Sequence, residues 1–226
     1  MILELSADLG EGSPGEDEIW PLIHRANVAC GGHTGDDDSM RIAAALAERH
    51  NVILGAHPSY PDRENFGRKS LSVSPEALRA SLESQLAALA RHAKVHHVKP
   101  HGALYNDAHQ SRSLADVIVS ALPPDVALVA PDSSQMAIAA RAAGIKVIRE
   151  AFADRRYEPD GSLTPRSLPG STLTIQEAAA QALLLAHEAT VIARDGTRIP
   201  IAFDTLCLHA DMPGAADRLR AIRAEL

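Results

Sequence analysis

The chain has 226 residues, of which 46% are hydrophobic, so it can bury a substantial core and a single domain over residues 1–226 is expected. Its formal charge of −7, without a basic run, argues against nucleic acid or an anionic membrane as a partner. Cys30 and Cys207 are just two thiols, far apart in the sequence, so neither a disulfide framework nor a zinc-knuckle spacing is indicated. No apolar run approaches the roughly 20 residues of a membrane span. The N-terminal residues also lack the pattern of a signal peptide, so we expect a cytoplasmic globular protein.

Short apolar strands alternate with helices rich in alanine and leucine. In chain order we expect strands at residues 2–8 and 26–30, a helix at 38–49 and a strand at 52–57. A long helix then runs from Pro75, capped by Ser74, to about residue 91, and leads to a strand at 95–99.

The second half of the chain continues this alternation. Helices are expected at 111–122 and 135–143, the latter capped by Asp132, with strands at 126–130 and 145–150. Thr174 and Glu177 form a capping box before a helix that ends near residue 189. Asp195-Gly196 predicts an inserted hairpin, and a strand at 203–209 and a helix at 213–226 end the chain.

Seven strands that alternate with helices predict a parallel sheet with right-handed crossovers, either a closed barrel or a doubly wound open sheet. The open sheet that binds nucleotides has a glycine-rich turn after its first strand. Here that turn is Gly10-Glu11-Gly12, whose acidic surroundings repel a pyrophosphate, and no Walker-type lysine follows. Reactive groups after many different strands are typical of a barrel. We therefore predict a single-domain, seven-stranded (β/α) barrel.

The densest group of reactive side chains lies at residues 98–106, after a short β-branched strand. Pro100 ends regular pairing and Gly102 allows a sharp turn. Lys99, one of four lysines, and His101 stand beside them, and Tyr105 and Asn106 follow. This pattern indicates the edge of an active site.

Six of the seven expected strands end in polar groups of this kind, and the carboxyl ends of barrel strands meet at one rim. The groups are Asp8 with Glu11; Asn27, Cys30 and His33; His57 with Tyr60 and Asp62; Lys99 with His101, Tyr105 and Asn106; Glu150 with Asp154, Arg155 and Tyr157; and His209 with Asp211. The fifth strand ends in Pro131-Asp132, which is typical of a plain helix start.

Several sequence blocks resemble the LamB/YcsF family, which includes the A subunit of the prokaryotic ATP-dependent 5-oxoprolinase. They cover nearly the whole chain in order: ADLGE (7–11), ANVACG with His33 (26–33), GAHP (55–58), FGR (66–68), HVKPHGALYN (97–106), FADR with Tyr157 (152–157) and CLHAD (207–211). The resemblance implies a seven-stranded barrel related to the glycoside hydrolase/deacetylase superfamily. Gly32 and Ser59 depart from the family pattern, and the segment after Glu11 is short, which affects the expected pocket wall.

The resemblance also implies cleavage of the lactam of 5-oxo-L-proline to L-glutamate, coupled to ATP hydrolysis, together with 5-oxoprolinase subunits B and C. Since the chain has no phosphate cradle of its own, the ATP site is expected mainly on the partner subunits. Two alternatives remain: a stand-alone metal-dependent carbohydrate or amide deacetylase, and a non-catalytic subunit of the complex.

Lactam opening needs activation of water, stabilisation of an oxyanion and protonation of the leaving nitrogen. Asp8 or Glu11 is a candidate general base, and His57 and His101 are candidates for proton transfer. Lys99 or Arg155 is a candidate for stabilising an anion. The predicted catalytic set is Asp8, Glu11, His57, Lys99 and His101, and the predicted substrate-binding set is Asn27, His33, Tyr105, Asn106, Asp154, Arg155 and His209.

A divalent metal is a competing interpretation of the same residues. Asp8, His57, His101 and His209 with Asp211 are ligand types that zinc accepts, although no local HxH or HExxH spacing brings them together. Structural interpretations also stay open. Cys30 is a candidate small apolar filler, Asp154-Arg155 a candidate ion pair, and only one of His96 and His97 can face the pocket because they alternate across a strand.

Overall fold

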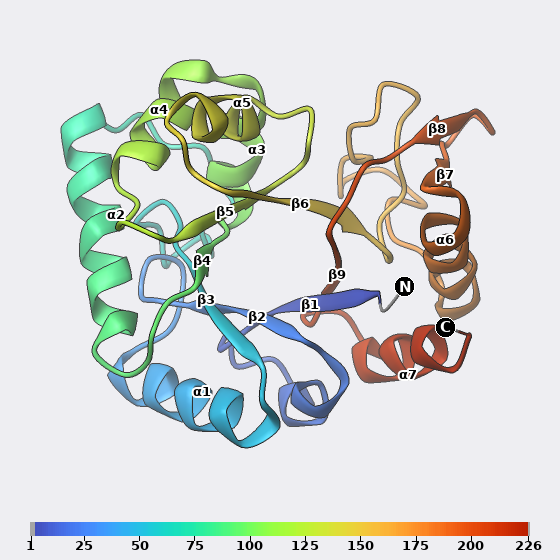
Figure 1. Ribbon diagram of the computed structural model, residues 1–226, viewed down its shortest axis with the longest axis horizontal. Coiled ribbons are helices and arrows are strands. Elements are labelled where there is room, and N and C mark those ends of the chain that lie inside the picture. The colour runs from blue at the N-terminus through green and yellow to red at the C-terminus, as the bar shows by residue number, and fades with distance from the viewer. Residues whose placement is uncertain (1–2, 226) are drawn as a thin grey trace.

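The computed structural model describes residues 3–225, so Ile2 of the first expected strand and Leu226 of the last expected helix lie outside the described residues. Seven parallel strands close into a barrel in the order β1-β2-β3-β4-β5-β6-β9 (Figure 1). The strands are β1 (Glu4–Leu9), β2 (Arg25–Ala29), β3 (Ile53–His57), β4 (His97–Val98), β5 (Ala127–Ala130), β6 (Val147–Phe152) and β9 (Thr205–His209). The predicted seven-stranded barrel is confirmed.

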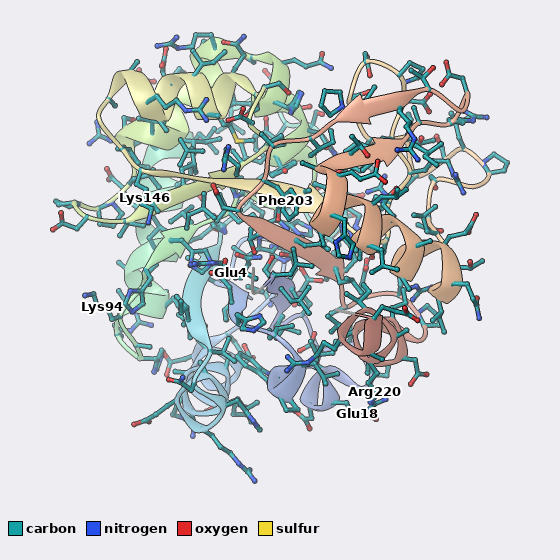
Figure 2. The ribbon with its side chains drawn as sticks, turned by 45° about the vertical axis from the view of Figure 1, so that its right-hand side comes forward. Glu4, Glu18, Lys94, Lys146, Phe203 and Arg220 are labelled. Atoms are coloured by element: carbon teal, nitrogen blue, oxygen red, sulfur yellow. The ribbon has the colours of Figure 1, made fainter. Side chains whose placement is uncertain are left out.

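Helices surround this barrel (Figure 1). They are η1 (Glu16–Glu18), η2 (Trp20–Leu22), α1 (Asp37–His50), α2 (Pro75–Ala90), α3 (Gly102–Gln110), α4 (Arg112–Ser120), α5 (Gln135–Ala142), α6 (Ile175–Glu188) and α7 (Ala215–Glu225). The predicted hairpin is also present as β7 (Thr190–Ile192) and β8 (Arg198–Pro200), an antiparallel pair outside the barrel. At the periphery, Arg220 of α7 reaches Glu18 of η1 at 2.6 Å (Figure 2). Within residues 3–225, no helix is long and apolar enough to cross a membrane.

Most helix starts follow the predicted caps. Thr174 and Glu177 form the expected capping box at the start of α6, and the Ser74 hydroxyl accepts from the backbone of α2. The predicted cap of α5 was wrong. Ser134 caps this helix by accepting from the Ala137 N–H at 3.1 Å, whereas Asp132 pairs with an arginine on the same helix.

The segment after β4 differs most from the sequence-based expectation. Only His97 and Val98 of the expected strand at 95–99 are paired as a strand. The chain then turns at Gly102, whose φ of +55° is in the left-handed region, and continues as α3. The sequence did not indicate α3, because a proline followed two residues later by a glycine has the composition of a loop. Because α3 begins already at Gly102, Tyr105 follows His101 by one helical turn and lies just below the barrel rim.

The hydrophobic core lies mainly between the barrel and its helices. Leu5 and Leu9 of β1 are buried there with Leu82 of α2, Leu104 of α3 and Leu219 of α7. The residues that alternate with this apolar set along the strands include polar ones, for example Asp8 in β1 and Asn27 in β2, which are also buried. Because side chains alternate across a strand, the apolar set faces the helices and the polar set faces the barrel interior. The fold therefore directs its buried polar groups to the inside of the barrel.

Candidate active site

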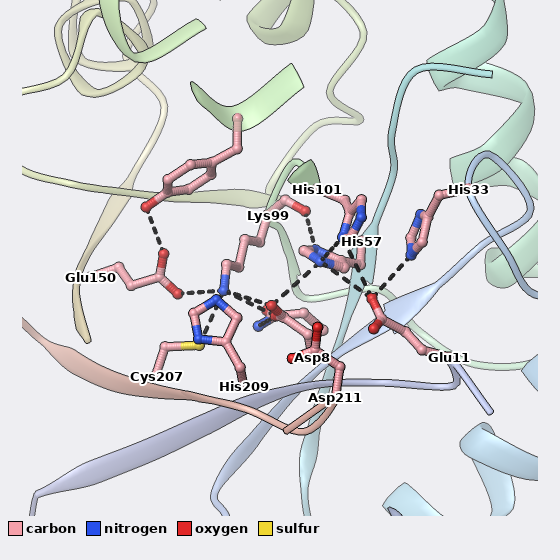
Figure 3. Close-up of polar contacts among 12 residues, drawn as sticks. Asp8, Glu11, His33, His57, Lys99, His101, Glu150, Cys207, His209 and Asp211 are labelled. Carbon is pink, nitrogen blue, oxygen red and sulfur yellow. Dashed lines mark hydrogen bonds and ion pairs between the residues drawn. The ribbon is translucent and has the colours of Figure 1, made fainter. Parts of the chain in front are cut away.

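The polar groups that follow the strands converge at one rim of the barrel in two connected clusters (Figure 3). One cluster is centred on the ammonium group of Lys99 and the other on the carboxyl group of Glu11. His57 lies between them, with its Nε2 3.4 Å from Asp8 Oδ2 and 3.9 Å from Glu11 Oε1. The five residues predicted to be catalytic are thus brought together.

Lys99 is a buried cation held by three side chains. Its Nζ lies 2.9 Å and 3.1 Å from the two carboxylate oxygens of Asp8, 2.8 Å from Glu150 Oε1 and 3.1 Å from Cys207 Sγ. Burial by itself lowers the pKa of a lysine, but Asp8, Cys207 and Glu150 raise the pKa of Lys99 well above its usual value. Lys99 therefore stays charged, and its three N–H donors point at protein groups.

Glu150 extends the lysine cluster towards α3. Its Oε2 accepts a hydrogen bond of 2.7 Å from the Tyr105 hydroxyl, and burial together with this carboxylate raises the pKa of Tyr105 well above its usual value. Lys99 Nζ also lies 5.3 Å from the centre of the Phe152 ring, at cation–π distance. Tyr105 is thus a supporting member of the cluster. Glu150, which the sequence placed at the rim but in neither predicted set, is the second buried acid of this cluster.

Asp8 is fixed as an anion at the junction of the two clusters. Besides Lys99, it accepts a hydrogen bond of 2.8 Å from Asn27 Nδ2. Burial raises the pKa of Asp8, but the neighbouring His57, Lys99 and His209 outweigh burial and hold it far below its usual range. Asp8 is therefore a permanent acceptor at neutral pH.

Glu11 has the opposite character. Its Oε1 lies 3.0 Å from His33 Nε2 and 3.4 Å from His101 Nδ1. Burial and the charge of Asp8 raise the pKa of Glu11 to about 7. Near neutral pH its carboxyl group thus exchanges a proton readily, which suits a general base or acid.

The loop that carries Glu11 is held by an acid outside the predicted site. The carboxylate of Glu16 accepts three backbone hydrogen bonds of 3.0 Å, from Gly10, Glu11 and Ser13. This arrangement closes the short loop after β1 and fixes the backbone of Glu11. Glutamate three residues after Ser13 is a common helix-start pattern, so the sequence carried a weak signal for it.

Backbone carbonyls fix the tautomers of two histidines. His57 Nδ1 lies 2.7 Å from the Lys99 carbonyl, and His101 Nε2 lies 3.0 Å from the Phe66 carbonyl, so each of these nitrogens carries a proton. The other two nitrogens, His57 Nε2 and His101 Nδ1, are only 3.0 Å apart and both present lone pairs. Two facing lone pairs are stable when the two nitrogens share a proton or a metal cation. The carboxyl group of Glu11, 3.4 Å from His101 Nδ1, can supply such a proton.

The donor types here fit a divalent metal. Glu11, His33 and His101 each offer a ligand atom, all within 4.8 Å of one another. Burial lowers the pKa of both His33 and His101 to about 4, so both imidazoles are neutral and able to ligate. The Phe66 carbonyl also orients His101 from behind, as outer-shell groups do in metal sites. A bound metal would supply a polarised water or a Lewis acid.

This trio differs from the ligand set considered from the sequence. His209 pairs with Asp154 and is not part of the trio. The carboxylate of Asp154 lies 3.1 Å from His209 Nδ1 and accepts the His209 backbone N–H at 2.9 Å. Asp211 pairs with Arg68, whose guanidinium is 2.5 Å from Asp211 Oδ2, and is not part of the trio either. Asp154 and His209 nevertheless form a pair beside the lysine cluster, where the His209 ring stacks on Phe152 with centroids 5.5 Å apart.

Two of the residues predicted to bind substrate lie away from both clusters. Arg155 is buried, but its guanidinium donates to the carbonyls of Thr164, at 2.7 Å, and Ser171, at 3.2 Å. It therefore holds the long loop before α6 together and does not pair with Asp154 in the way considered from the sequence. Asn106 is exposed on α3 and contributes no side-chain hydrogen bond within the described residues.

Two structural interpretations can be assigned. Burial raises the pKa of Cys30 to about 12, so its thiol stays protonated and it fills space in the core. Gly32 and Ser59, the two departures from the family pattern, lie together: a Cβ built on Gly32 comes within 2.4 Å of Ser59 Oγ and 2.3 Å of Gln85 Oε1. Ser59 and Gln85 thus fill the space beside residue 32, which leaves room only for a glycine there.

A closed parallel barrel that gathers acidic groups and imidazoles at one rim has the architecture of the (β/α)-barrel proteins, whose reactive groups lie at the carboxyl ends of the strands. The family model described as LamB/YcsF family matches residues 3–226, and the chain belongs to this family. It is 46% identical to the 5-oxoprolinase A subunit of Methylococcus capsulatus, over 99% of this chain and 92% of the relative. It is 43% identical to the 5-oxoprolinase A subunit of Neisseria meningitidis serogroup A, over 99% and 95%.

Solved structures agree with this assignment. The lactam utilization protein from Thermus thermophilus has a TM-score of 0.92 and 41% sequence identity, covering 100% of this chain and 96% of that one. A putative cellobiose-phosphate cleavage protein from Enterococcus faecalis has a TM-score of 0.57 at 10% identity, covering 98% and 88%. The second likeness concerns the fold alone.

Proposed function

We propose that this chain acts as the A subunit of an ATP-dependent 5-oxoprolinase, in which it opens the lactam of 5-oxo-L-proline to give L-glutamate together with subunits B and C. The observation that supports this most is the joint rim site of Lys99, Asp8 and Glu11 with its histidines, in a chain whose full-length relatives are named as 5-oxoprolinase A subunits. Use of ATP favours a cytoplasmic location for this activity.

The rim groups suit the steps that lactam opening needs. Glu11, with its pKa near 7, is the group we assign to taking a proton from water and returning one to the leaving nitrogen. His57 and His101 link Glu11 to Asp8 and offer a path for that proton. Lys99 acts through the field of its buried charge, because its N–H groups are engaged by Asp8, Glu150 and Cys207.

The ATP-dependent step is assigned to the whole complex. Opening a five-membered lactam at neutral pH is close to uphill, so it needs a driving force. The printed sequence has no Walker-type loop, and the glycines after β1 flank an acid that repels phosphate. A nucleotide site mainly on subunits B and C fits these features.

A metal-dependent amide hydrolase that acts alone is the second candidate, favoured by the Glu11, His33 and His101 trio. The experiment that separates the two is a glutamate-release assay on 5-oxo-L-proline and ATP, with this chain alone, with B and C alone and with all three. We expect release only from the full set. Release by this chain alone, abolished by a chelator, would support the second candidate, whereas release by B and C alone would make this chain non-catalytic.

A further inference from the structure

A line of polar side chains crosses the barrel interior from its opposite end to Asp8. It begins at Glu4, which is part-exposed at the start of β1 and binds Arg25 through two hydrogen bonds of 2.8 Å and 3.0 Å. Arg25 reaches His97 Nδ1 at 2.9 Å, and His97 Nε2 lies 2.8 Å from Asn27 Oδ1. Asn27 Nδ2 then donates to Asp8 at 2.8 Å.

The direction of every hydrogen bond in this line is determined by Arg25. A guanidinium has donors and no acceptor, so His97 Nδ1 must accept from Arg25 and the ring proton must be on Nε2. That proton is donated to the Asn27 oxygen. The amide nitrogen of Asn27 consequently faces Asp8, whereas the flipped amide would set an oxygen against the carboxylate.

The His97 ring fits between β4 and β2 because residue 55 of β3 is a glycine. His97 is in β4 and Asn27 is in β2, and β3 lies between these strands in the barrel. The contact passes over Gly55 of β3, which is paired with Asn27 in register. A Cβ at Gly55 would lie 2.2 Å from His97 Nε2, so any larger residue displaces the imidazole.

We propose that His97 is a positioning residue, which Arg25 holds in its Nε2–H form and which orients the Asn27 amide so that it donates to Asp8. Its kinetic consequence rests on the proposed function. His97 is fully buried, and burial and Arg25 lower its pKa well below the usual value, so the ring stays neutral. An imidazolium would instead direct a second N–H at the guanidinium.

A network that only stabilises the barrel would include the same contacts. The test therefore has to report which ring nitrogen of His97 carries the proton. Spectra of the isolated protein labelled with ¹⁵N in its histidines report the protonated ring nitrogen, and the His97→Gln variant assigns the signals. We expect His97 as the neutral Nε2–H tautomer at neutral pH. An Nδ1–H tautomer or an imidazolium would overturn the proposal without involving 5-oxoproline.

Turnover by the assembled complex gives the second readout. His97→Leu removes both contacts and Gly55→Ala displaces the ring, so we expect each to lower glutamate release on the order of 10- to 100-fold in folded protein. His97→Gln offers an acceptor to Arg25 and a donor to Asn27, and should restore most of the rate. The neighbouring exposed His96→Leu is the matched control.

Equal rates in folded His97→Leu and wild type would overturn the proposal, as would equal losses in the Leu and Gln variants. If His97→Leu does not fold, the comparison of His97→Gln with Gly55→Ala decides in its place. No glutamate release from the wild-type complex would count against the proposed function alone, because the imidazole spectra judge the orientation of His97 independently.

Discussion

Lys99 is a buried cation that two buried acids share. Asp8 and Glu150 approach it from β1 and β6, on opposite sides of the ammonium group (Figure 3). Removal of one partner from a buried ion pair leaves an uncompensated charge, which costs more than the pair contributes. The site thus requires the positive charge of Lys99 both for folding and for keeping Asp8 ionised.

Substitution of Lys99 by methionine keeps the length of the side chain and removes its charge. We expect the unfolding free energy to fall by about 3–5 kcal/mol, and glutamate release by the assembled complex to drop at least about 100-fold. Denaturant unfolding and the glutamate assay measure these effects. Lys94→Met, at an exposed lysine at the edge of the molecule (Figure 2), is the control and should change neither. Normal turnover in Lys99→Met would remove lysine from the catalytic set.

The raised pKa of Glu11 predicts a pH-dependent stability. Its pKa is about 7 in the folded protein against an ordinary value of 4.5, so the folded state keeps a proton that the unfolded chain has lost between these values. The stabilising contribution is complete below pH 4.5 and is lost as the pH rises through 7. His33 and His101, lowered to about 4, act with the opposite sign and lose stability as the pH falls from 6.5.

Glu11→Gln isolates this contribution, because glutamine resembles the protonated carboxyl group at every pH. Relative to wild type, the variant should gain about 2.5 kcal/mol of unfolding free energy between pH 5 and pH 8. Urea unfolding across that range, in protein freed of metal, measures the difference. A difference that does not vary with pH would show that Glu11 is ionised throughout.

At the scale of elements, the site depends on the contact of α3 with the loop after β3. Gly102, the first residue of α3, has a φ of +55°, and a Cβ there would lie 2.6 Å from the Gly67 carbonyl. The same carbonyl accepts the Ala103 N–H at 2.9 Å, and the adjoining Phe66 carbonyl holds His101. The two segments thus fix the orientation of one imidazole together.

Gly102→Ala should separate these segments. We expect a loss of about 2–3 kcal/mol of unfolding free energy, from left-handed backbone strain and displacement of the Gly67 carbonyl, and a fall in turnover. Gly144→Ala is a matched control, since Gly144 also has a positive φ of +72° but nothing within 4 Å of its added Cβ. It should lose about 1 kcal/mol and keep its turnover. Similar turnover in the two variants would show that the contact does not matter for the site.

Much of the element order could be predicted from the sequence. Alternation of apolar strands with helices, the Ser74 and Thr174 caps and the Asp195-Gly196 turn are local patterns, and the structure confirms each. Strands that end in polar groups also predicted a shared rim, because parallel barrel strands place their carboxyl ends together. The group of reactive side chains at residues 98–106 was placed at this rim for the same reason.

The rest depends on distances between segments far apart in the chain. Nothing local to Arg155 indicates that its guanidinium binds the carbonyls of Thr164 and Ser171, and so its place after a strand predicted a contact with substrate. Nothing local to His97 distinguishes it from His96, since the direction of each side chain depends on barrel closure. The trio of possible metal ligands was missed for the same reason: Glu11, His33 and His101 follow three different strands.

At the scale of the whole molecule, three loops meet over the mouth of the barrel. Asp211, just after β9, is 2.5 Å from Arg68 in the loop after β3 and 3.6 Å from Arg166 in the loop after β6. Both guanidinium groups approach the same oxygen, Asp211 Oδ2, and both remain partly exposed. Arg68 also lies 5.3 Å from the Phe66 ring, which contacts His33 and His101. The positive charge at the mouth is thus connected to the acid–imidazole cluster.

The carboxylate of 5-oxo-L-proline is an anion that these arginines can recognise on entry. We expect Arg68→Gln and Arg166→Gln each to raise the KM for 5-oxo-L-proline about tenfold, because a charge-assisted contact with a carboxylate is lost, and to change kcat much less. Arg112→Gln, at an exposed arginine paired with Asp116 on α4, should alter neither constant. Initial rates of glutamate release by the assembled complex give KM and kcat for each variant. If kcat falls while KM is unchanged, the arginines serve the chemical step or the closure of the loops, and the substrate carboxylate is bound elsewhere.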